Sequence, residues 1–139
     1  MVVVGFNFTK MNVERKKPIK GKVKITNNVS IKNVELQDLA LGKEKQKGLR
    51  FTFEFVTKYM NDFGQISLTG EVVYLDSEKK VKDAAEKWKK SKSVQKDVMT
   101  QILNNILNKC NIQALILSQQ INLPAPIPLP KVDVDKKKK

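Results

Sequence analysis

Two hydrophobic periodicities divide this chain, and their order restricts it to one fold class. Up to about residue 75, apolar residues recur at every second position, the pattern of half-buried antiparallel strands. From about residue 78 to residue 119 they recur at every third and fourth position, the pattern of an amphipathic helix. Strands that precede helix, rather than alternate with it, predict an α+β fold: a four-stranded antiparallel sheet followed by a long amphipathic helix.

The first two predicted strands are Val2–Phe8 and Lys22–Lys32. In the second, lysines and small polar residues occupy one face and apolar residues the other, namely Val23, Ile25, Val29 and Ile31. The alternation then slips by one position, which predicts a bulge or a strand end near Asn33. The glycine-bounded polar segment Leu41–Gly48 is interpreted as a loop.

The next two strands are predicted to form a hairpin, with Phe51, Phe53 and Phe55 on one face of the first. The same face of the second strand is predicted to carry Ile66, Leu68, Val72 and Tyr74. Asn61–Gly64 is expected to be the loop, with Gly64 at positive φ, so that Phe53 faces Val72. We interpret the phenylalanines as core beneath the helix; the alternative is an open platform that stacks on nucleic-acid bases.

The helical half is predicted to begin at Asp76 or Ser77, either of which is a good N-cap. Four residues then share one face of a helix: Val81, Ala84, Ala85 and Trp88. Ser91–Ser93 either breaks the helix or weakens it, and the apolar pattern resumes at Val94. No Gly or Pro interrupts residues 71–123, so one long helix or two abutting helices are expected to reach Gln119.

Proline occupies every second position from Pro124 to Pro130. A residue that precedes proline is disfavoured in the helical region, so this segment is predicted to be extended. Its Leu and Ile side chains are too apolar for a solvated linker, and we expect it to dock on the fold. Residues 1–130 are thus expected to form one domain, and 131–139 a disordered lysine-rich tail.

The composition is strongly basic, because 27 Lys and Arg outnumber 14 Asp and Glu and leave a net charge of +13. Only Arg15 and Arg50 are arginines, the residue that makes bidentate contacts with phosphate and guanine. A lysine surplus therefore favours solubility or diffuse attraction to polyanions over sequence-specific readout. Three lysine-rich clusters are candidate nucleic-acid contacts or simply solvated faces: Lys10–Lys24, Lys43–Arg50 and Lys79–Lys96.

The sequence offers little to catalysis. It has no histidine, one cysteine (Cys110) and no Gly-rich phosphate loop, which excludes an intramolecular disulfide and a Cys/His zinc site. The strand acids Glu54 and Glu71 are interpreted as solvated. We therefore expect no enzyme activity, catalytic residue, metal or cofactor. A lone cysteine favours the reducing cytoplasm, and no run of 18 apolar residues predicts a membrane span.

More apolar residues are present than one sheet–helix core can bury. Val56, Val73 and Leu75 fall on the sheet face opposite the phenylalanines, and further apolar residues lie in or beside turns. On the predicted helix, Ile112, Leu115 and Ile116 broaden the apolar stripe. Such a surplus predicts either self-association or apolar grooves that bind a partner.

The order of these parts resembles the SecB family of export chaperones and its SecB-like relatives, from about Val3 to Pro130. Four strands and a long helix (Lys79–Gln119) are followed by Asn-Leu-Pro-x-Pro at Asn122–Pro126. The resemblance implies a homotetramer, built as a dimer of dimers, that holds unfolded polypeptides in apolar grooves without ATP and serves protein transport. The family has a further helix where this chain has Lys131–Lys139, so the resemblance is to a minimal form. The family's SecA-docking surface is acidic and this chain is basic, which argues against delivery to SecA.

The resulting hypothesis is an ATP-independent molecular chaperone, a holdase that captures unfolded polypeptide clients by hydrophobic contact. The client-binding residues are predicted to be Leu39, Leu41, Met60, Phe63, Leu123, Ile127 and Leu129. One alternative is a basic nucleic-acid-binding module. Another is an assembly subunit whose apolar surface serves only its own oligomer.

Overall fold

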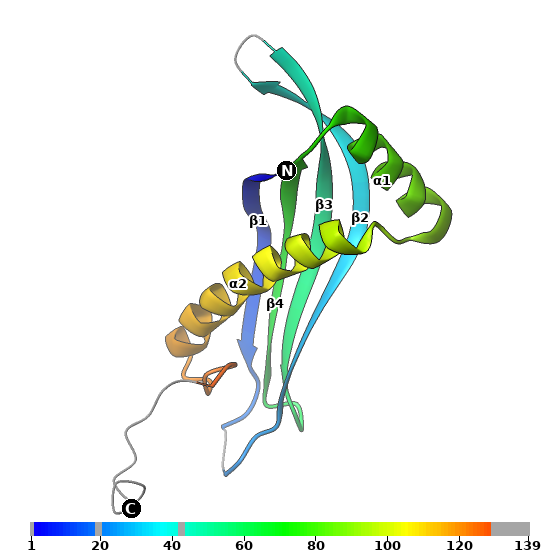
Figure 1. Cartoon of the computed structure of the whole chain (residues 1–139). Helices are drawn as coiled ribbons and strands as arrows, with labels where there is room; N and C mark the ends of the chain where they lie inside the picture. Colours follow the sequence, from blue (N-terminus) through cyan, green and yellow to red (C-terminus); the bar gives the residue numbers. More distant parts are fainter. Residues whose placement is uncertain (1, 19–20, 42–43, 129–139) are drawn as a thin grey trace, which may run out of the picture.

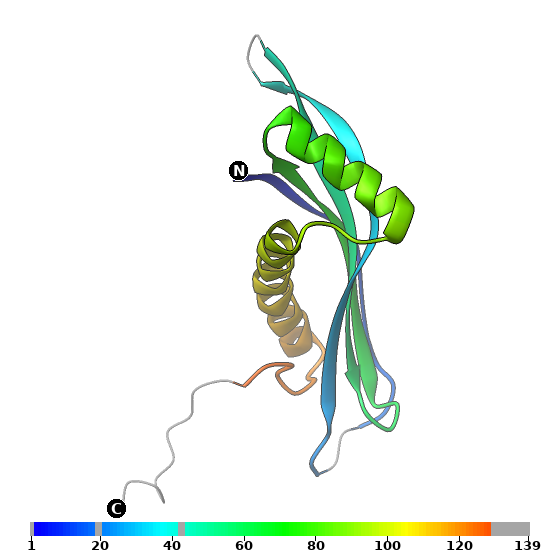
Figure 2. The same ribbon diagram turned by 45° about the vertical axis from the view of Figure 1, so that its right-hand side comes forward.

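The protein forms one twisted antiparallel sheet with two helices on the same face (Figures 1 and 2), in a computed structural model that describes residues 2–18, 21–41 and 44–128. The elements in chain order are β1 (Val2–Arg15), β2 (Ile25–Leu41), β3 (Glu44–Tyr59), β4 (Gly64–Leu75), α1 (Glu78–Ser91) and α2 (Lys96–Gln120). The strand order is β1-β4-β3-β2. The predicted α+β class, a four-stranded antiparallel sheet followed by helix, is confirmed.

The strands are longer than the sequence pattern predicts. β2 and β3 stay paired from Ile25 opposite Tyr59 as far as Leu41 opposite Glu44, so most of the expected loop Leu41–Gly48 is strand. This part of the hairpin extends beyond the helices in Figure 1. Backbone pairing continues there without a core to cover, and polar residues are therefore tolerated in a strand.

The bulge predicted near Asn33 is confirmed. The β2–β3 register shifts between Ile31 and Asn33, which returns Val34 to the inner face, opposite Phe51. Val34 is 2% exposed, so the extra residue keeps the apolar set of β2 on the helix-covered side.

The β3–β4 hairpin has the predicted faces but a register two residues away from the predicted one. Phe53 faces Gly70 rather than Val72. The loop is Met60–Phe63, in which Asn61 and Asp62 adopt positive φ, while Gly64 begins β4. Asn and Asp tolerate the left-handed region, so the loop does not need the glycine.

Gly70 explains why this register is preferred. A Cβ at Gly70 would lie 2.8 Å from Cζ of Phe53 and 2.2 Å from the backbone oxygen of Asn7. The ring of Phe53 therefore covers the glycine and packs with Phe6 and Phe8, at centroid distances of 5.3 and 6.3 Å.

The phenylalanine face is core, as predicted. Phe51, Phe53 and Phe55 are fully buried under the helices. Helix α1 contacts β3 and β2, and α2 contacts β4, β1 and β3. The buried residues of α1 are those predicted, and α2 buries a continuous stripe made of Val98, Ile102, Ile106, Cys110, Ala114 and Ser118.

The chain breaks the helical half into two helices, one of the two outcomes that the sequence left open. Lys92 takes a left-handed conformation with φ of 54°, and its N–H bonds to the carbonyl of Trp88. Val94, 6% exposed, pins the connection to the core before α2 begins. At the start of α1 the hydroxyl of Ser77 accepts from the N–H of Lys80, the predicted capping. Within the described part of the chain, neither helix is long and apolar enough to cross a membrane.

Candidate polypeptide-binding surface

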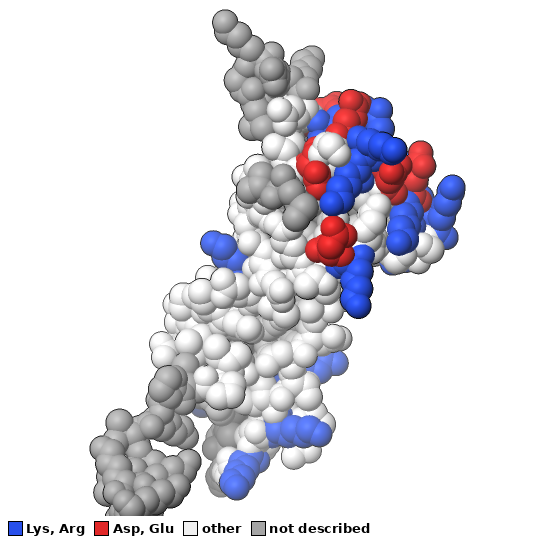
Figure 3. All heavy atoms as spheres, viewed as in Figure 1, with Lys and Arg blue, Asp and Glu red and all other residues white. Residues whose placement is uncertain are grey.

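The outward face of α2 is the largest uncharged surface in the view of Figure 3, whereas acidic and basic side chains crowd over α1. Lys109 is the only charged residue between Val98 and Gln120. Ile112 and Ile116, one turn apart on this face, are 56% and 45% exposed. We call these two isoleucines the α2 face.

The predicted client-binding residues lie at two ends of the sheet. Leu39 is on β2 opposite Gln46, near the β2–β3 tip, and Met60 and Phe63 lie in the β3–β4 turn at the other end, lower in Figure 1. The 14 residues of β3 from Gln46 to Tyr59 span about 45 Å at the rise of a strand. One groove therefore cannot contain all seven residues. The side chain of Leu41 and all of Leu129 lie outside the described residues.

The lower end brings several of these residues together with the C-terminal segment. Leu123 is 6% exposed and Ile127 half-buried. A Cβ at Gly64 would lie 3.0 Å from Leu123, so the leucine packs directly on the start of β4. Phe63 is half-buried against the same core, and Met60 remains 42% exposed at its rim. The predicted docking of the segment is confirmed as far as Pro128, although a bend at Pro126 and Ile127 interrupts the predicted extended form.

A left-handed turn directs the chain from α2 back onto the sheet. Asn122 has φ of 60°, and the N–H of Leu123 donates to the carbonyl of Ser118 at 2.8 Å. This is the long-range bond of a Schellman motif, in which asparagine replaces the usual glycine. We call the docked residues Leu123–Pro128 the strap.

Two side chains of the sheet hold the strap by its backbone. The hydroxyl of Tyr59 donates to the carbonyl of Pro124 at 2.5 Å, and the amide nitrogen of Asn27 donates to the carbonyl of Pro126 at 3.1 Å. The hydroxyl of Thr57, fully buried, donates to the amide oxygen of Asn27 at 2.6 Å. Burial raises the pKa of Tyr59 to about 12, so its hydroxyl remains a donor at neutral pH.

The acids that the sequence analysis singled out lie on the helix-free face of the sheet. Glu54 pairs with Lys32 at 3.6 Å, and Arg50 contacts both Glu35 and Glu71. These are partly exposed ion pairs on a polar sheet surface, in keeping with their interpretation as solvated residues. Cys110 is fully buried in the inner stripe of α2, and burial raises the pKa of its thiol to about 12, which leaves little reactive thiolate at neutral pH.

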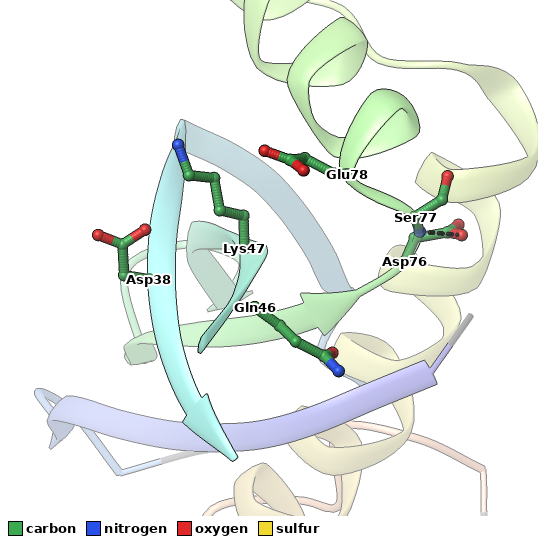
Figure 4. Close-up of a pocket in the computed structure, with 6 residues that line it drawn as sticks. All are labelled: Asp38, Gln46, Lys47, Asp76, Ser77 and Glu78. Carbon is green, nitrogen blue, oxygen red and sulfur yellow. Dashed lines mark hydrogen bonds between the residues drawn. The ribbon is translucent and has the colours of Figure 1, made fainter. Parts of the chain in front are cut away.

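A polar pocket of about 540 Å³ lies where β4 leads into α1 (Figure 4). Its walls come from β2, β3 and the start of α1, and the lining residues are Asp38, Gln46, Lys47, Asp76, Ser77 and Glu78. Burial by itself would raise the pKa of Asp76. Hydrogen bonds from the Ser77 N–H and the Tyr74 hydroxyl, together with the charge of Lys80, outweigh burial, so the pKa lies below its ordinary value. These contacts show that Asp76 stabilises the connection between β4 and α1.

Sequence reasoning missed the polar residues that hold the strap, Tyr59 and Asn27, together with Thr57, which orients Asn27. Thr57 interrupts an otherwise apolar alternation from Leu49 to Tyr59. A polar residue at a core position needs a buried partner, so this interruption pointed to a polar contact at the lower end. The alternation did not show which residues would supply that contact. Ser118 interrupts the apolar stripe of α2 as well, but its hydroxyl donates to the carbonyl of Leu115 in its own helix.

Comparison with known proteins adds one structural similarity. No protein-family model matches the sequence, and no curated protein does. One matching solved structure is the Rv1957 SecB-like chaperone of Mycobacterium tuberculosis in complex with a ChAD peptide from the Rv1956 HigA1 antitoxin. The match covers 94% of this chain and 90% of that chain, with a TM-score of 0.48 and 11% identity. A match at this score and identity supports no conclusion about family or function.

Proposed function

We propose that this protein is an ATP-independent chaperone, a holdase that binds unfolded polypeptides through apolar surface. The observation that carries the proposal is the α2 face: two isoleucines about half exposed on a helix that has one charge over 23 residues, in a chain of net charge +13. A helix face that met only water would be expected to carry charged residues, as α1 does. The same proposal holds that the protein binds polypeptides rather than catalyses a reaction, and that it needs no cofactor.

The partner that suits this face is a polypeptide with exposed apolar side chains. Burial of apolar area contributes about 25 cal/mol per Å², so a few client side chains on such a face give reversible capture. The lysines on the rest of the surface would keep a loaded complex soluble. The resemblance of the sequence to the SecB family leads us to propose further that the protein works as a homotetramer, a dimer of dimers, in the cytoplasm, and serves protein transport.

The test is aggregation of an unrelated unfolded protein, followed by light scattering with and without stoichiometric amounts of this protein and without ATP. We expect suppression that changes little between about 50 and 200 mM salt, because apolar contacts are not screened. A nucleic-acid-binding module would instead bind RNA tightly, with affinity falling on the order of a thousandfold over that range if six or more phosphates are contacted. Absence of suppression together with such RNA binding would overturn the proposal.

The mass of the protein in solution, together with the aggregation assay, distinguishes the holdase from an assembly subunit whose apolar surface serves only its own oligomer. If the α2 face serves only the protein's own assembly, the complex is oligomeric and aggregation is not suppressed. The proposal expects suppression by whichever oligomer forms, measured on the same preparation by light scattering and analytical ultracentrifugation.

A further inference from the structure

The strap is held in the manner of a bound peptide rather than of a sheet strand. Its two hydrogen bonds from the sheet end on the carbonyls of Pro124 and Pro126, two residues apart. Neither bond involves a strap side chain, and prolines have no N–H with which to extend the backbone pairing of the sheet. What the sheet recognises is therefore an apolar chain with two accessible backbone carbonyls, and this description fits many polypeptides.

The donors for those carbonyls belong to two strands of the sheet. Tyr59 lies on the inner face of β3 and is 1% exposed with the strap in place. Asn27 lies on the adjacent strand opposite Thr57, whose hydroxyl occupies the amide oxygen of Asn27 and leaves its nitrogen to donate. Preorganised donors of this kind lower the ordering cost of binding, as in peptide sites that capture backbone groups.

The apolar part of the contact is equally general. Leu123 and Pro126 are the buried side chains of the strap, and the first packs against Gly64 at the start of β4. The strap follows the C-terminal end of α2, and Ile116 lies only about 6 Å along the axis from that end, at 1.5 Å per residue. The end of α2 from which the strap leaves is therefore about one helical turn from Ile116.

We infer that the strap is the resident, displaceable occupant of a binding site for extended apolar polypeptide, whose backbone carbonyls are received by Tyr59 and Asn27. This inference rests on the proposed function and assigns part of the client contact to the lower end of the sheet. Exchange replaces one pair of carbonyls by another, so the two donors are satisfied in both states. The client's further contacts with Ile112 and Ile116 then favour the client over the strap. On this inference Leu123 and Ile127, predicted from sequence to line a groove, would occupy one.

The first experiment follows the strap directly. Pro128, which is exposed, is replaced by cysteine (P128C) in the full chain, and this cysteine is spin-labelled. Cys110 is fully buried, so the parent protein treated in the same way should take up little label and serves as the control. The probe is a reduced and alkylated, permanently unfolded protein. Stoichiometric probe should convert the label from restricted to mobile motion. Suppression of aggregation with a label that stays restricted would overturn the inference and leave the proposed function intact.

The second experiment uses a peptide and does not depend on holdase activity. A synthetic peptide with the sequence of residues 122–128 should release the labelled strap at sufficient concentration, and a version with lysine in place of its leucine and isoleucine should release it far less. If the natural peptide leaves the label restricted even at millimolar concentration, the site does not exchange its occupant and the inference is wrong.

Paired variants test whether the donors serve the client as well as the strap. Tyr59→Phe combined with Asn27→Ala removes both donors, and we expect a more mobile label without client but a client affinity within about threefold of the parent, because strap and client each lose the same two hydrogen bonds. A client affinity that rises about tenfold or more would show that the donors hold the strap alone and would overturn the inference.

The matched control variant is Tyr74→Phe combined with Asn28→Ala. Tyr74 is equally buried but donates to Asp76 at the other end of β4, and Asn28 is an exposed neighbour of Asn27. This variant should keep both the restricted label and the client affinity of the parent. If it mobilises the label as much as the test variant does, the effect is one of general stability and the assignment of the donors is wrong.

Discussion

The two helices cover the same sheet face in the same way and present opposite surfaces to the outside. Each buries a mainly apolar stripe, which runs from Val81 to Trp88 in α1 and from Val98 to Ser118 in α2. Outside, α1 carries intermixed lysines and acids, including the pair Lys82–Glu78 at 3.0 Å. The outside of α2 carries amides and isoleucines instead.

This difference identifies which helix is built to meet water. The charges of α1 hydrate its outer face and complement its dipole, since Glu78 lies in its first turn and Lys89 and Lys90 in its last. Helix α2 has no basic residue in its last turn and gains its C-terminal stability from the strap. The contrast therefore points to α2 and the adjoining strap, not α1, as the surface for a partner.

The largest expected effect tests the shared part of the comparison, the inner stripes. Ile106→Ala removes a fully buried side chain of α2 and should lower the free energy of unfolding by about 3 kcal/mol, within the range for large-to-small core changes. Val81→Ala in α1 removes fewer atoms and should cost roughly 2 kcal/mol. Urea denaturation measures both, and Asn108→Ala on the exposed side should change stability by less than about 0.5 kcal/mol. A similar small change for Ile106→Ala would mean that α2 is not packed on the sheet.

The next effect concerns the outer faces. Ile112→Lys combined with Ile116→Lys should leave the fold intact and weaken client binding by about 2 kcal/mol, or roughly thirtyfold. The reason is that the exposed half of each isoleucine would be buried by a client, and lysine removes this apolar contact. Fluorescence titration with an unfolded protein measures the affinity.

The control for these lysines is on the same helix. Asn104→Lys combined with Asn108→Lys adds the same charge at the same spacing on exposed positions and should change client affinity less than threefold. Equal losses from the two variants would show that charge rather than apolar contact was tested. A fall in oligomeric mass for the isoleucine variant alone would assign the α2 face to a subunit contact.

A smaller effect concerns the hydrogen bonds that hold the strap after α2, for which α1 has no counterpart among the bonds described above. Tyr59→Phe releases one bond to the strap after α2 and should cost about 1 kcal/mol at neutral pH. Burial raises the pKa of Tyr59 to about 12, from about 10 in the unfolded chain, so its contribution is complete below pH 10 and is lost as the pH rises towards 12. The stability difference between parent and variant should therefore shrink across that interval in urea titrations. A constant difference would show that burial does not raise the pKa of Tyr59.

The smallest effect has the opposite sign and compares the two helix ends. At the end of each helix the chain continues through a left-handed residue that is not glycine. This residue is Lys92 after α1 and Asn122 after α2. Lys92→Gly should raise stability by about 0.5 to 1 kcal/mol, because lysine is strained in that region. Asn122→Gly should change stability by only a few tenths, since asparagine tolerates the left-handed region well. Thermal unfolding measures both; a destabilised Lys92→Gly variant would mean that the lysine side chain contributes more than its backbone costs.

Much of the fold was predictable because it depends on which residues share a face. The inner residues of β3, β4 and α1 and the bulge beside Asn33 follow directly from the periods of two and 3.6. The β3–β4 register did not follow, since moving the partner of Phe53 from Val72 to Gly70 keeps every side chain on its face. Contact between the ring of Phe53 and Gly70 decides between the two registers, and neither period contains it.

The candidate site divides in the same way. Ile112 and Ile116 could be recognised as surplus apolar residues on a helix, and the strap as a segment that must dock. Leu39 and Leu123 looked equivalent as apolar residues near turns, yet the structure places them at opposite ends of the sheet. The donors Tyr59 and Asn27 come from two strands and meet a segment about 65 and 99 residues further along the chain.

By itself, the sequence determined the fold class, the inner face of each element, the break or weakness at Ser91–Ser93 and the docking of a proline-rich segment, because all of these depend on the local spacing of apolar, glycine and proline residues. Only the tertiary structure decided the strand order with β1 beside β4, the β3–β4 register, and which residues hold the strap. These features depend on contacts between residues far apart in the chain, where shape and hydrogen-bond geometry distinguish arrangements that share one hydrophobic pattern.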